Sequence, residues 1–314
     1  MPRRYAVLSV GTNSTRMLLA EMEPGIPRVG AARTIGTRIG EGLREEGELR
    51  EQAMARTLDA LRELLDEIAG RYDLLVTIAT SALRRARNAD AFAERVRALT
   101  GERLRVLSGD EEATASFRGA VGSVTDSAAS HGVVDVGGGS TEYALGTGRV
   151  PDVVRSYEIG AVRLTERIPE LTGANGVVSE SARDAAYEAA RTVLAPMREL
   201  PRIDRMLCVG GSATTSAAIL GGGGGAREPA EFGREDLRAL LGRLCERHLA
   251  ARKRLPGMRP QRADILPAGI IVLDVALECA GHAGAVVANG DLLLGTLLQE
   301  RERIAGDEPI GRQA

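Results

Sequence analysis

Two stretches of the chain, residues 6–20 and 132–146, repeat one pattern of apolar and polar positions. In each stretch an aliphatic and β-branched run leads into a short polar or glycine-rich turn, and a second apolar run follows. Aligned without a gap, identical residues are Val7, Val10, Gly11, Ser14, Thr15 and Leu19 against Val133, Val136, Gly137, Ser140, Thr141 and Leu145. The pattern predicts two related β-hairpins with polar tips.

A second repeated pattern lies further along each half of the chain. The apolar run 74–79 ends in a Thr-Ser-Ala turn at 80–82, and the apolar run 206–209 ends in a Gly-Gly-Ser-Ala turn at 210–213. Both runs are typical of buried strands that end in a small-residue turn and open a helix. Because both repeated patterns occur in the same order in the two halves, each half is predicted to contain a hairpin, a third strand, a helix, a strand and a helix. This is an α/β fold.

Amphipathic patterns predict the helices between these strands. Apolar faces with charges opposite them predict helices over 48–69, 88–101, 179–200 and 237–249. We expect the second of these to be capped by Asn88 with Asp90 and ended by Gly101. Pro267 suits the first turn of a later helix.

Small and polar residues mark the connecting segments. The stretch 122–131, which includes His131, is the expected linker between the halves. The glycine run 221–225 is not followed by the Gly-Lys-Ser/Thr of a nucleotide-binding loop, so we interpret it as a mobile loop.

Length and charge narrow the class of protein. At 314 residues the chain exceeds the usual size of a single core, which favours two domains. Apolar residues make up 44% and aromatic residues 3%, which suits helices packed on sheets. The 41 basic and 43 acidic residues are interspersed and give a net charge of −2, so no basic surface for binding nucleic acid is expected. The same balance favours short polyanions over long ones.

The cysteines and apolar segments indicate the compartment. Cys208, Cys245 and Cys279 lack metal-site or disulfide spacing, so buried thiols are expected. The apolar run after the N-terminal arginines is too short for a signal peptide, and the stretch 265–277 is too short to span a membrane. We expect a cytoplasmic protein without a membrane partner.

Four small-residue turns are candidates for binding phosphate, namely Gly11–Ser14, Thr80–Ala82, Gly137–Thr141 and Gly210–Thr214. Backbone N–H groups in such turns and at helix N-termini provide fixed positive potential for an anion. Each turn alone is more often an ordinary tight turn. Because they form two pairs related by the duplication, we expect them to converge on one cleft between the halves.

Carboxylates accompany these turns. Asp135 ends an apolar strand immediately before a glycine turn, and Glu142 lies just past that turn. A buried carboxylate requires a partner, which a metal, a bound cation or an Asx turn would provide. A further run, Asp110-Glu111-Glu112, starts a helix near the boundary between the halves. Such runs usually compensate the helix dipole, but this one is placed to face the cleft.

As an ordered set, these motifs closely resemble those of the Ppx/GppA family, over nearly the whole chain. The motifs are Val10-Gly-Thr-Asn-Ser14, Ala79-Thr-Ser-Ala-Leu-Arg84 with Asn88, Ser108-Gly-Asp-Glu-Glu-Ala113, Asp135-Val-Gly-Gly-Gly-Ser-Thr-Glu142, Gly160-Ala-Val-Arg-Leu-Thr-Glu166, Gly210-Gly-Ser-Ala-Thr214 and Arg262-Ala-Asp264.

The resemblance implies two ribonuclease-H-like domains of the actin/hexokinase/Hsp70 (ASKHA) superfold around a central cleft. We expect the first domain at residues 1–125 and the second at 126–289, with a final helix in 290–314 packing back on the first. A homodimer is a further expectation from the family.

The resemblance also implies the site. Glu112 would be the general base, Arg84 would grip the terminal phosphates, and Asp135 and Glu142 would bind Mg²⁺ or another divalent cation. The implied phosphate-binding residues are Thr12, Asn13, Ser14, Gly137, Gly138, Gly139, Ser140, Thr141, Gly210, Gly211 and Ser212.

The expected activity is exopolyphosphatase-type release of terminal orthophosphate from short polyphosphate or guanosine pentaphosphate. The family usually has Asp where this chain has Ser9, and the sequence ends near 314 without the family's additional C-terminal regions. The first departure leaves open a regulator that binds polyphosphate or (p)ppGpp without hydrolysis; the second disfavours processive action on long chains. A kinase or ATPase of the same superfold is a further alternative.

Overall fold

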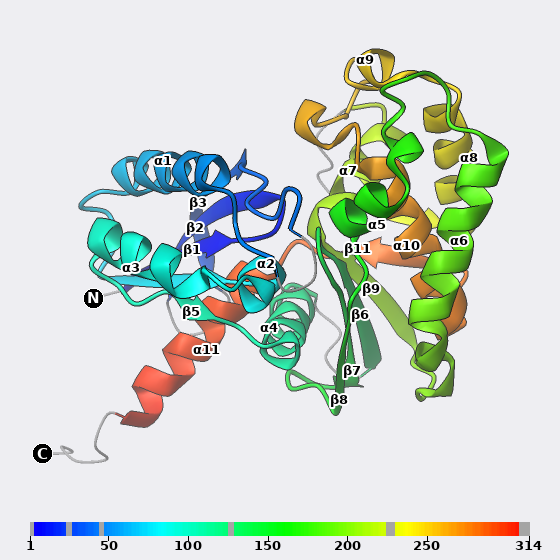
Figure 1. The fold of residues 1–314 in the computed structure, drawn as a ribbon. Helices are drawn as coiled ribbons and strands as arrows, with labels where there is room; N and C mark the ends of the chain where they lie inside the picture. Colours follow the sequence, from blue (N-terminus) through cyan, green and yellow to red (C-terminus); the bar gives the residue numbers. More distant parts are fainter. Residues whose placement is uncertain (1–2, 23–26, 44–46, 125–128, 224–229, 308–314) are drawn as a thin grey trace, which may run out of the picture.

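The computed structural model describes residues 3–22, 27–43, 47–124, 129–223 and 230–307, which contain two β-sheets flanked by helices. Figure 1 shows two α/β halves side by side, with the blue and cyan segments in one half and the green to orange segments in the other. The C-terminal helix, drawn in red, returns to the first half.

The first sheet has the strand order β3-β2-β1-β4-β5. Its strands are β1 (Arg4–Val10), β2 (Ser14–Glu21), β3 (Arg28–Gly36), β4 (Leu74–Ala79) and β5 (Arg105–Val106). The first three are antiparallel neighbours, and β4 runs parallel to β1. Successive side chains of β1 point to opposite faces. Leu8 joins the core under α1 (Glu51–Glu67) and α3 (Ala89–Thr100), whereas Val7 joins the core under α11 (Leu292–Asp307).

The second sheet has the strand order β10-β11-β9-β6-β7-β8. Its strands are β6 (Ser130–Val136), β7 (Thr141–Thr147), β8 (Val153–Tyr157), β9 (Arg205–Val209), β10 (Glu231–Gly233) and β11 (Gly284–Val287). One face is covered by α5 (Ala161–Arg167), α6 (Glu180–Leu194), α7 (Gly210–Leu220), α8 (Arg234–Cys245) and α10 (Leu266–Ala280). The other face packs on α4 (Gly109–Gly122), through residues such as Phe117. The short elements are α2 (Ser81–Arg85), α9 (Leu249–Arg252), η1 (Pro169–Thr172), η2 (Ala195–Glu199) and η3 (Pro260–Arg262).

Both predicted hairpins are confirmed, and their registers correspond. Ser9 lies opposite Arg16 in the β1–β2 hairpin, and Asp135 lies opposite Glu142 in the β6–β7 hairpin. The third strand, helix, strand and helix also follow each hairpin in the predicted order. The duplication therefore places equivalent side chains at equivalent points of the two halves.

Most predicted helices are present, with two corrections. Asn88 occupies the N-cap position of α3, but its amide bonds both backbone groups of Leu49 instead of capping the helix. The helix predicted over 237–249 is wrong in extent, because α8 ends at Cys245 and α9 begins separately at Leu249. Gly101 ends α3 in the left-handed conformation, as predicted.

Two predictions about connecting segments have different outcomes. The placement of His131 in a linker is wrong, because β6 begins at Ser130 and His131 is fully buried in it. Pairing with β7 and β9 makes a strand of a stretch whose composition is typical of a loop. Residues 224 and 225 of the glycine run lie outside the described residues, so the mobile loop stays a prediction.

Helices α4 and α11 cross between the two sheets at glycine residues. A Cβ atom at Gly295 would overlap the carbonyl oxygen of Ala115, and one at Gly119 would overlap the carbonyl oxygen of Asp291. Only glycine allows backbones to approach this closely. This crossing connects the halves, and the domain boundaries proposed from the sequence stay a prediction.

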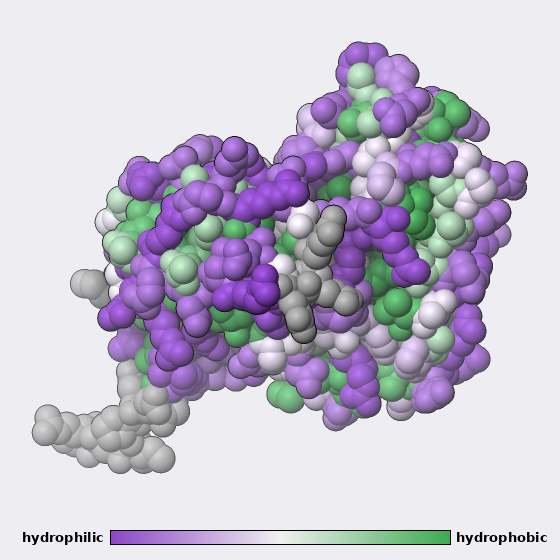
Figure 2. Space-filling model, in the orientation of Figure 1, coloured by the Kyte–Doolittle hydropathy of each residue, from purple (hydrophilic) through white to green (hydrophobic). Residues whose placement is uncertain are grey.

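The face of the molecule shown in Figure 2 is mainly polar. Figure 2 shows charged and polar residues over most of both halves, with apolar residues in small patches on the face displayed. Among the helices that the structure describes, none has the length and apolar character needed to cross a membrane. Cys208, Cys245 and Cys279 are all buried free thiols, as predicted.

Candidate active site

The tips of the two duplicated hairpins meet at the cleft. Each tip is closed by the same backbone hydrogen bond, from Gly11 N–H to the Ser14 carbonyl (2.9 Å) and from Gly137 N–H to the Ser140 carbonyl (3.0 Å). A Cβ atom at Gly138 would lie 3.0 Å from Cβ of Thr12. Glycine at this position therefore lets the two tips approach each other closely.

A small cavity of about 80 Å³ lies between the tips. All four turns predicted to bind phosphate contribute to its lining. The lining residues with candidate roles are Ser9, Thr12, Asn13, Ser14, Thr80, Ser81, Glu112, Asp135, Gly137, Gly138, Gly139, Ser140, Gly210 and Gly211. The hairpin tips and the N-terminus of α7 thus meet at one small volume. Turns and helix N-termini of this kind are suited to binding an anion.

Two predicted phosphate ligands have side chains engaged away from the cavity. The Thr141 hydroxyl donates to the Ile159 carbonyl (2.6 Å). Ser212 is buried under α10, where a Cβ atom at Gly269 would collide with its hydroxyl. Their contribution to a bound phosphate would have to come from the backbone.

Two neighbouring glutamates at the start of α4 have different environments. Glu111 forms the capping box with Ser108, which is the ordinary role of an acidic residue at a helix start. Glu112 is 6% exposed and lines the cavity, and its Oε2 accepts a hydrogen bond from Arg84 Nη1 at 2.5 Å. Burial raises the pKa of Glu112 to about 7, against the opposing effect of Arg84. A carboxylate with this pKa can accept a proton near neutral pH.

Arg84 links the two halves beside Glu112. Besides Glu112, its guanidinium donates to the Leu107 carbonyl (2.9 Å) and approaches the Ser140 hydroxyl (3.4 Å). It also lies 3.8 Å from Glu142. Its charge is therefore held among the carboxylates next to the cavity.

Asp135 and Glu142 are cross-strand partners, so their side chains lie on the same face of the hairpin. Asp135 accepts a hydrogen bond from the Ser116 hydroxyl (2.7 Å), and Glu142 accepts one from the Ser156 hydroxyl (2.8 Å). Burial raises the pKa of Asp135. Burial, together with Glu112 and Asp135, raises the pKa of Glu142 well above its ordinary value. A cation bound here would favour the ionised form of both carboxyl groups.

The oxygen atoms of this pair suit a divalent cation. Glu142 Oε2 is buried without a hydrogen-bond partner among the described residues. Within the described part of the chain, no three His, Cys, Asp or Glu side chains gather into a complete metal site. Mg²⁺ commonly uses only one or two carboxylates and completes its shell with water and substrate phosphates. Asp135 lines the small cavity, whereas Glu142, 1% exposed, lies on the same face of the hairpin but is not among the lining residues. The chemistry of the pair fits an open site of this kind.

Two arginines at the cavity were absent from the predicted site. Arg16 lies opposite Ser9 and forms an ion pair with Asp291. The Arg262 guanidinium lies where a Cβ atom of Gly211 would be, and burial with Arg259 and Arg16 nearby lowers the pKa of Arg262 to about 10. The sequence duplication could have pointed to Arg16 as a site residue, because Arg16 aligns with Glu142 in the second hairpin.

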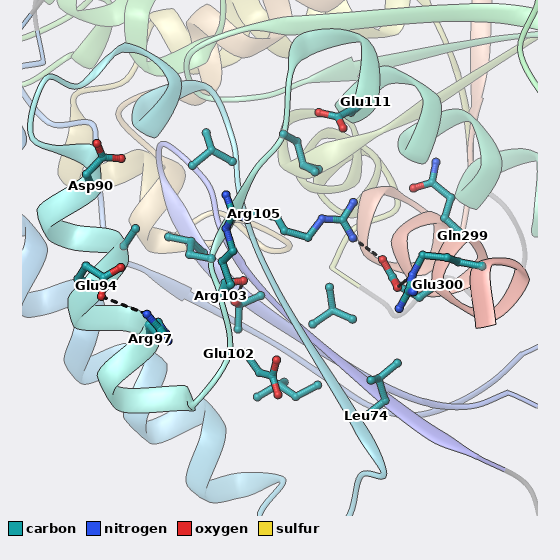
Figure 3. Close-up of a pocket in the computed structure, with 18 residues that line it drawn as sticks. Leu74, Asp90, Glu94, Arg97, Glu102, Arg103, Arg105, Glu111, Gln299 and Glu300 are labelled. Carbon is teal, nitrogen blue, oxygen red and sulfur yellow. Dashed lines mark hydrogen bonds and ion pairs between the residues drawn. The ribbon is translucent and has the colours of Figure 1, made fainter. Parts of the chain in front are cut away.

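A larger cavity, of about 1050 Å³, lies at the far edge of the first sheet (Figure 3). It is lined by β4, β5, α3 and α11, and many of its charges pair with one another, as in Arg105–Glu300 and Arg97–Glu94. None of the four phosphate turns lines it. The smaller cavity is therefore the better candidate for catalysis.

The comparison with protein families agrees with this site. The model of the Ppx/GppA phosphatase family matches residues 19–292. The chain belongs to this family. Exopolyphosphatase 2 of Mycobacterium tuberculosis is 34% identical to this Ppx/GppA chain, over 94% of the chain and 98% of that protein.

Solved structures agree with the fold. A Ppx/GppA family member from Aquifex aeolicus is 27% identical and superimposes with a TM-score of 0.78, covering 97% of this chain and 99% of that one. An exopolyphosphatase from Cytophaga hutchinsonii, 23% identical, has a TM-score of 0.85 over 96% of this chain and 98% of that one and shows the same fold. The predicted fold class is confirmed: two ribonuclease-H-like domains of the ASKHA superfold around a central cleft.

Proposed function

We propose that this chain is an exopolyphosphatase-type phosphohydrolase that releases terminal orthophosphate from short inorganic polyphosphate. The observation that carries the proposal is the cavity that the turns of both halves line together with Glu112 and Asp135. Membership of a phosphatase family supports phosphoanhydride hydrolysis, and the exopolyphosphatase relative supports polyphosphate as the substrate. Guanosine pentaphosphate offers the same terminal chemistry and is the second candidate substrate.

A neighbouring cavity of about 590 Å³ has room for the rest of the substrate. It shares the lining residues Arg16, Gly210, Gly211 and Arg262 with the small cavity, so the two are adjacent. In the proposed complex the terminal phosphoryl group occupies the small cavity, and the phosphates behind it extend past Arg16 and Arg262 into the larger one. Arginine pairs well with phosphate oxygens.

Glu112 is proposed to activate water. As the water oxygen bonds to the terminal phosphorus, Glu112 accepts its proton, and the bond to the bridging oxygen breaks. The shortened chain leaves with the bonding electron pair. Arg84 and the N–H donors of the tips hold the phosphoryl oxygens in line, so positioning and charge stabilisation provide most of the rate.

Asp135 and Glu142 are proposed to hold Mg²⁺ or another divalent cation. When bound, such an ion neutralises charge on the phosphate oxygens. The unpartnered Oε2 of Glu142 supports this assignment.

The test is release of orthophosphate from defined-length polyphosphates and from guanosine pentaphosphate with Mg²⁺. Glu112→Gln should lower kcat about 10²- to 10⁴-fold while substrate binding is retained. Glu111→Gln is the matched control, because the neighbouring side chain caps α4. A base must be deprotonated, so wild-type activity should rise through about pH 7. Unchanged turnover in Glu112→Gln would remove Glu112 from this role.

A regulator that binds polyphosphate or (p)ppGpp without hydrolysing it is the alternative. Ser9 favours it, because Ser9 lines the cavity at the position where the family usually has a carboxylate. Ser9→Asp separates the two functions. If the wild type binds short polyphosphate without releasing phosphate and Ser9→Asp does release it, the regulator is correct; release by the wild type supports the hydrolase.

A further inference from the structure

Residues 37–43, here called the strap, follow β3 and contact both halves. The strap is fixed to the tip of the first hairpin by its backbone. The N–H groups of Thr37 and Arg38 both donate to the Asn13 carbonyl, at 3.1 and 3.0 Å. Any displacement of the strap therefore acts on a phosphate-binding turn.

Arg38 has an uncommon backbone conformation. Its φ is 50°, and among the described residues it is the only one other than glycine with a positive φ. The left-handed region is unfavourable for residues with a Cβ atom, so surrounding contacts have to maintain it. Strain of this kind concentrates at sites where geometry matters for function.

The side chain of Arg38 crosses to the second half. Its two terminal nitrogens each lie 2.7 Å from an oxygen of Asp264, and Nη2 also donates to the Gln261 carbonyl at 3.0 Å. A planar fork that engages both carboxylate oxygens fixes orientation as well as distance. Gln261 and Asp264 flank Arg262, which lines the cavity. The fork therefore sets the position of Arg262 relative to the first hairpin.

A second contact connects the strap to the other hairpin tip. The Gly42 N–H donates to the Glu166 carboxylate on α5 at 2.8 Å. The first turn of α5 donates in turn to the carbonyls of Gly137 and Gly138, at 3.0 and 2.8 Å. The strap thus joins the first tip, the second tip and the segment that carries Arg262.

We infer that Arg38 is a positioning residue: its fork holds both phosphate turns and Arg262 at the separation that the terminal phosphoryl group requires. Release of the fork separates the tips, while the glycine crossing of α4 and α11 still connects the halves. The small cavity of about 80 Å³ makes such separation a route for substrate entry. The catalytic consequence rests on the proposed function, whereas the change in geometry does not.

The geometry is tested by measuring the distance between the halves with paired spin labels. Asp59→Cys on α1 and Val177→Cys in the second half place labels at exposed sites, and the native cysteines are buried. Arg38→Met and Asp264→Asn should both broaden the distance distribution toward longer values. Arg95→Met is the matched control, because its ion pair with Glu51 lies within the first half.

The kinetic test uses tripolyphosphate with Mg²⁺. Arg38→Met should lower kcat about 10- to 100-fold, with a smaller change in KM, because misplaced groups reduce turnover. The double variant should be no worse than either single variant, since both remove the same contact. Arg38→Lys keeps the charge without the fork and should fall between Arg38→Met and the wild type.

Each outcome decides the inference. Longer distances together with a lower kcat in both variants support it. Unchanged distances overturn it, as does an additive double variant, which would indicate that Arg38 and Asp264 act separately. If the wild type hydrolyses nothing, the proposed function fails, and the label distances still decide whether the strap holds the halves together.

Discussion

The two hairpins have nearly the same backbone and opposite charge at the same register. Both tips close with one N–H to carbonyl hydrogen bond, and both line the same cavity. At the cross-strand pair that flanks each tip, the first hairpin has Ser9 and Arg16, and the second has Asp135 and Glu142.

This difference suggests how a duplicated fold binds a polyanion. Backbone donors depend only on the turn conformation, so duplication provides them from both sides of the cleft. Side chains are free to diverge. In the proposed site, the first hairpin contributes Arg16 to pair with phosphate, and the second contributes Asp135 and Glu142 to hold a metal ion. In this proposal the catalytic chemistry depends on how the hairpins differ, and the binding geometry depends on what they share.

The largest effect is expected from removing a charge in the second hairpin. Asp135→Asn keeps the side-chain shape but weakens the proposed Mg²⁺ site, so kcat should fall at least about 100-fold. Calorimetric titration with Mg²⁺ should show weaker binding. Asp204→Asn is the control, because Asp204 is an exposed loop residue whose carboxylate accepts hydrogen bonds from Ser130. Full activity with unchanged Mg²⁺ affinity would remove the carboxylate–metal role from the second hairpin.

An intermediate effect is expected from the first hairpin. Arg16→Met should raise KM for short polyphosphate about 10- to 100-fold, the equivalent of one charge-assisted hydrogen bond, with a smaller change in kcat. Arg62→Met provides the matched loss of charge, because Arg62 and its partner Asp59 are exposed side chains of the same helix, α1. An equal KM in both variants would contradict the assignment of Arg16 to the substrate.

The local parts of this arrangement could be predicted from the sequence. Apolar runs on both sides of a short polar or glycine-rich turn define both hairpins, and small-residue turns after strands define the starts of α2 and α7. These patterns are short in range, so one stretch of sequence contains the whole signal. The cleft could be predicted because the duplication relates the turns in pairs.

The remaining features depend on contacts between distant segments. Arg262 and the Arg38–Asp264 fork bring together residues far apart in sequence, and no periodicity reports such a pairing. Glu111 and Glu112 are adjacent and chemically alike, so only the fold shows which one caps the helix and which one faces the cavity. His131 is in a strand because its neighbours pair with it.

The smallest expected effect is on thermal stability. It compares how the stability of variants at Glu142 and at Arg16 depends on pH. Burial, with Glu112 and Asp135 nearby, raises the pKa of Glu142 well above 4.5 in the folded protein. At a pH between the pKa of Glu142 in the unfolded chain and its raised pKa in the folded protein, metal-free folded protein keeps Glu142 protonated. The unfolded chain has already lost that proton. Stability therefore decreases as pH rises from the unfolded pKa through the raised one. Glu142→Gln removes this penalty, so its Tm relative to the wild type should increase by about 2–4 °C between about pH 5 and about pH 8.

Arg16→Met should show no such trend, because arginine keeps its charge throughout this range. Mg²⁺ at the higher pH should reduce the advantage of Glu142→Gln, since the ion stabilises only the protein that binds it. The measurement is thermal unfolding across pH, with chelator and then with Mg²⁺. A Tm difference that stays constant with pH would mean that Glu142 is not a buried ionisable group of the metal-free protein, and the electrostatic contrast between the hairpins would then rest on Asp135 alone.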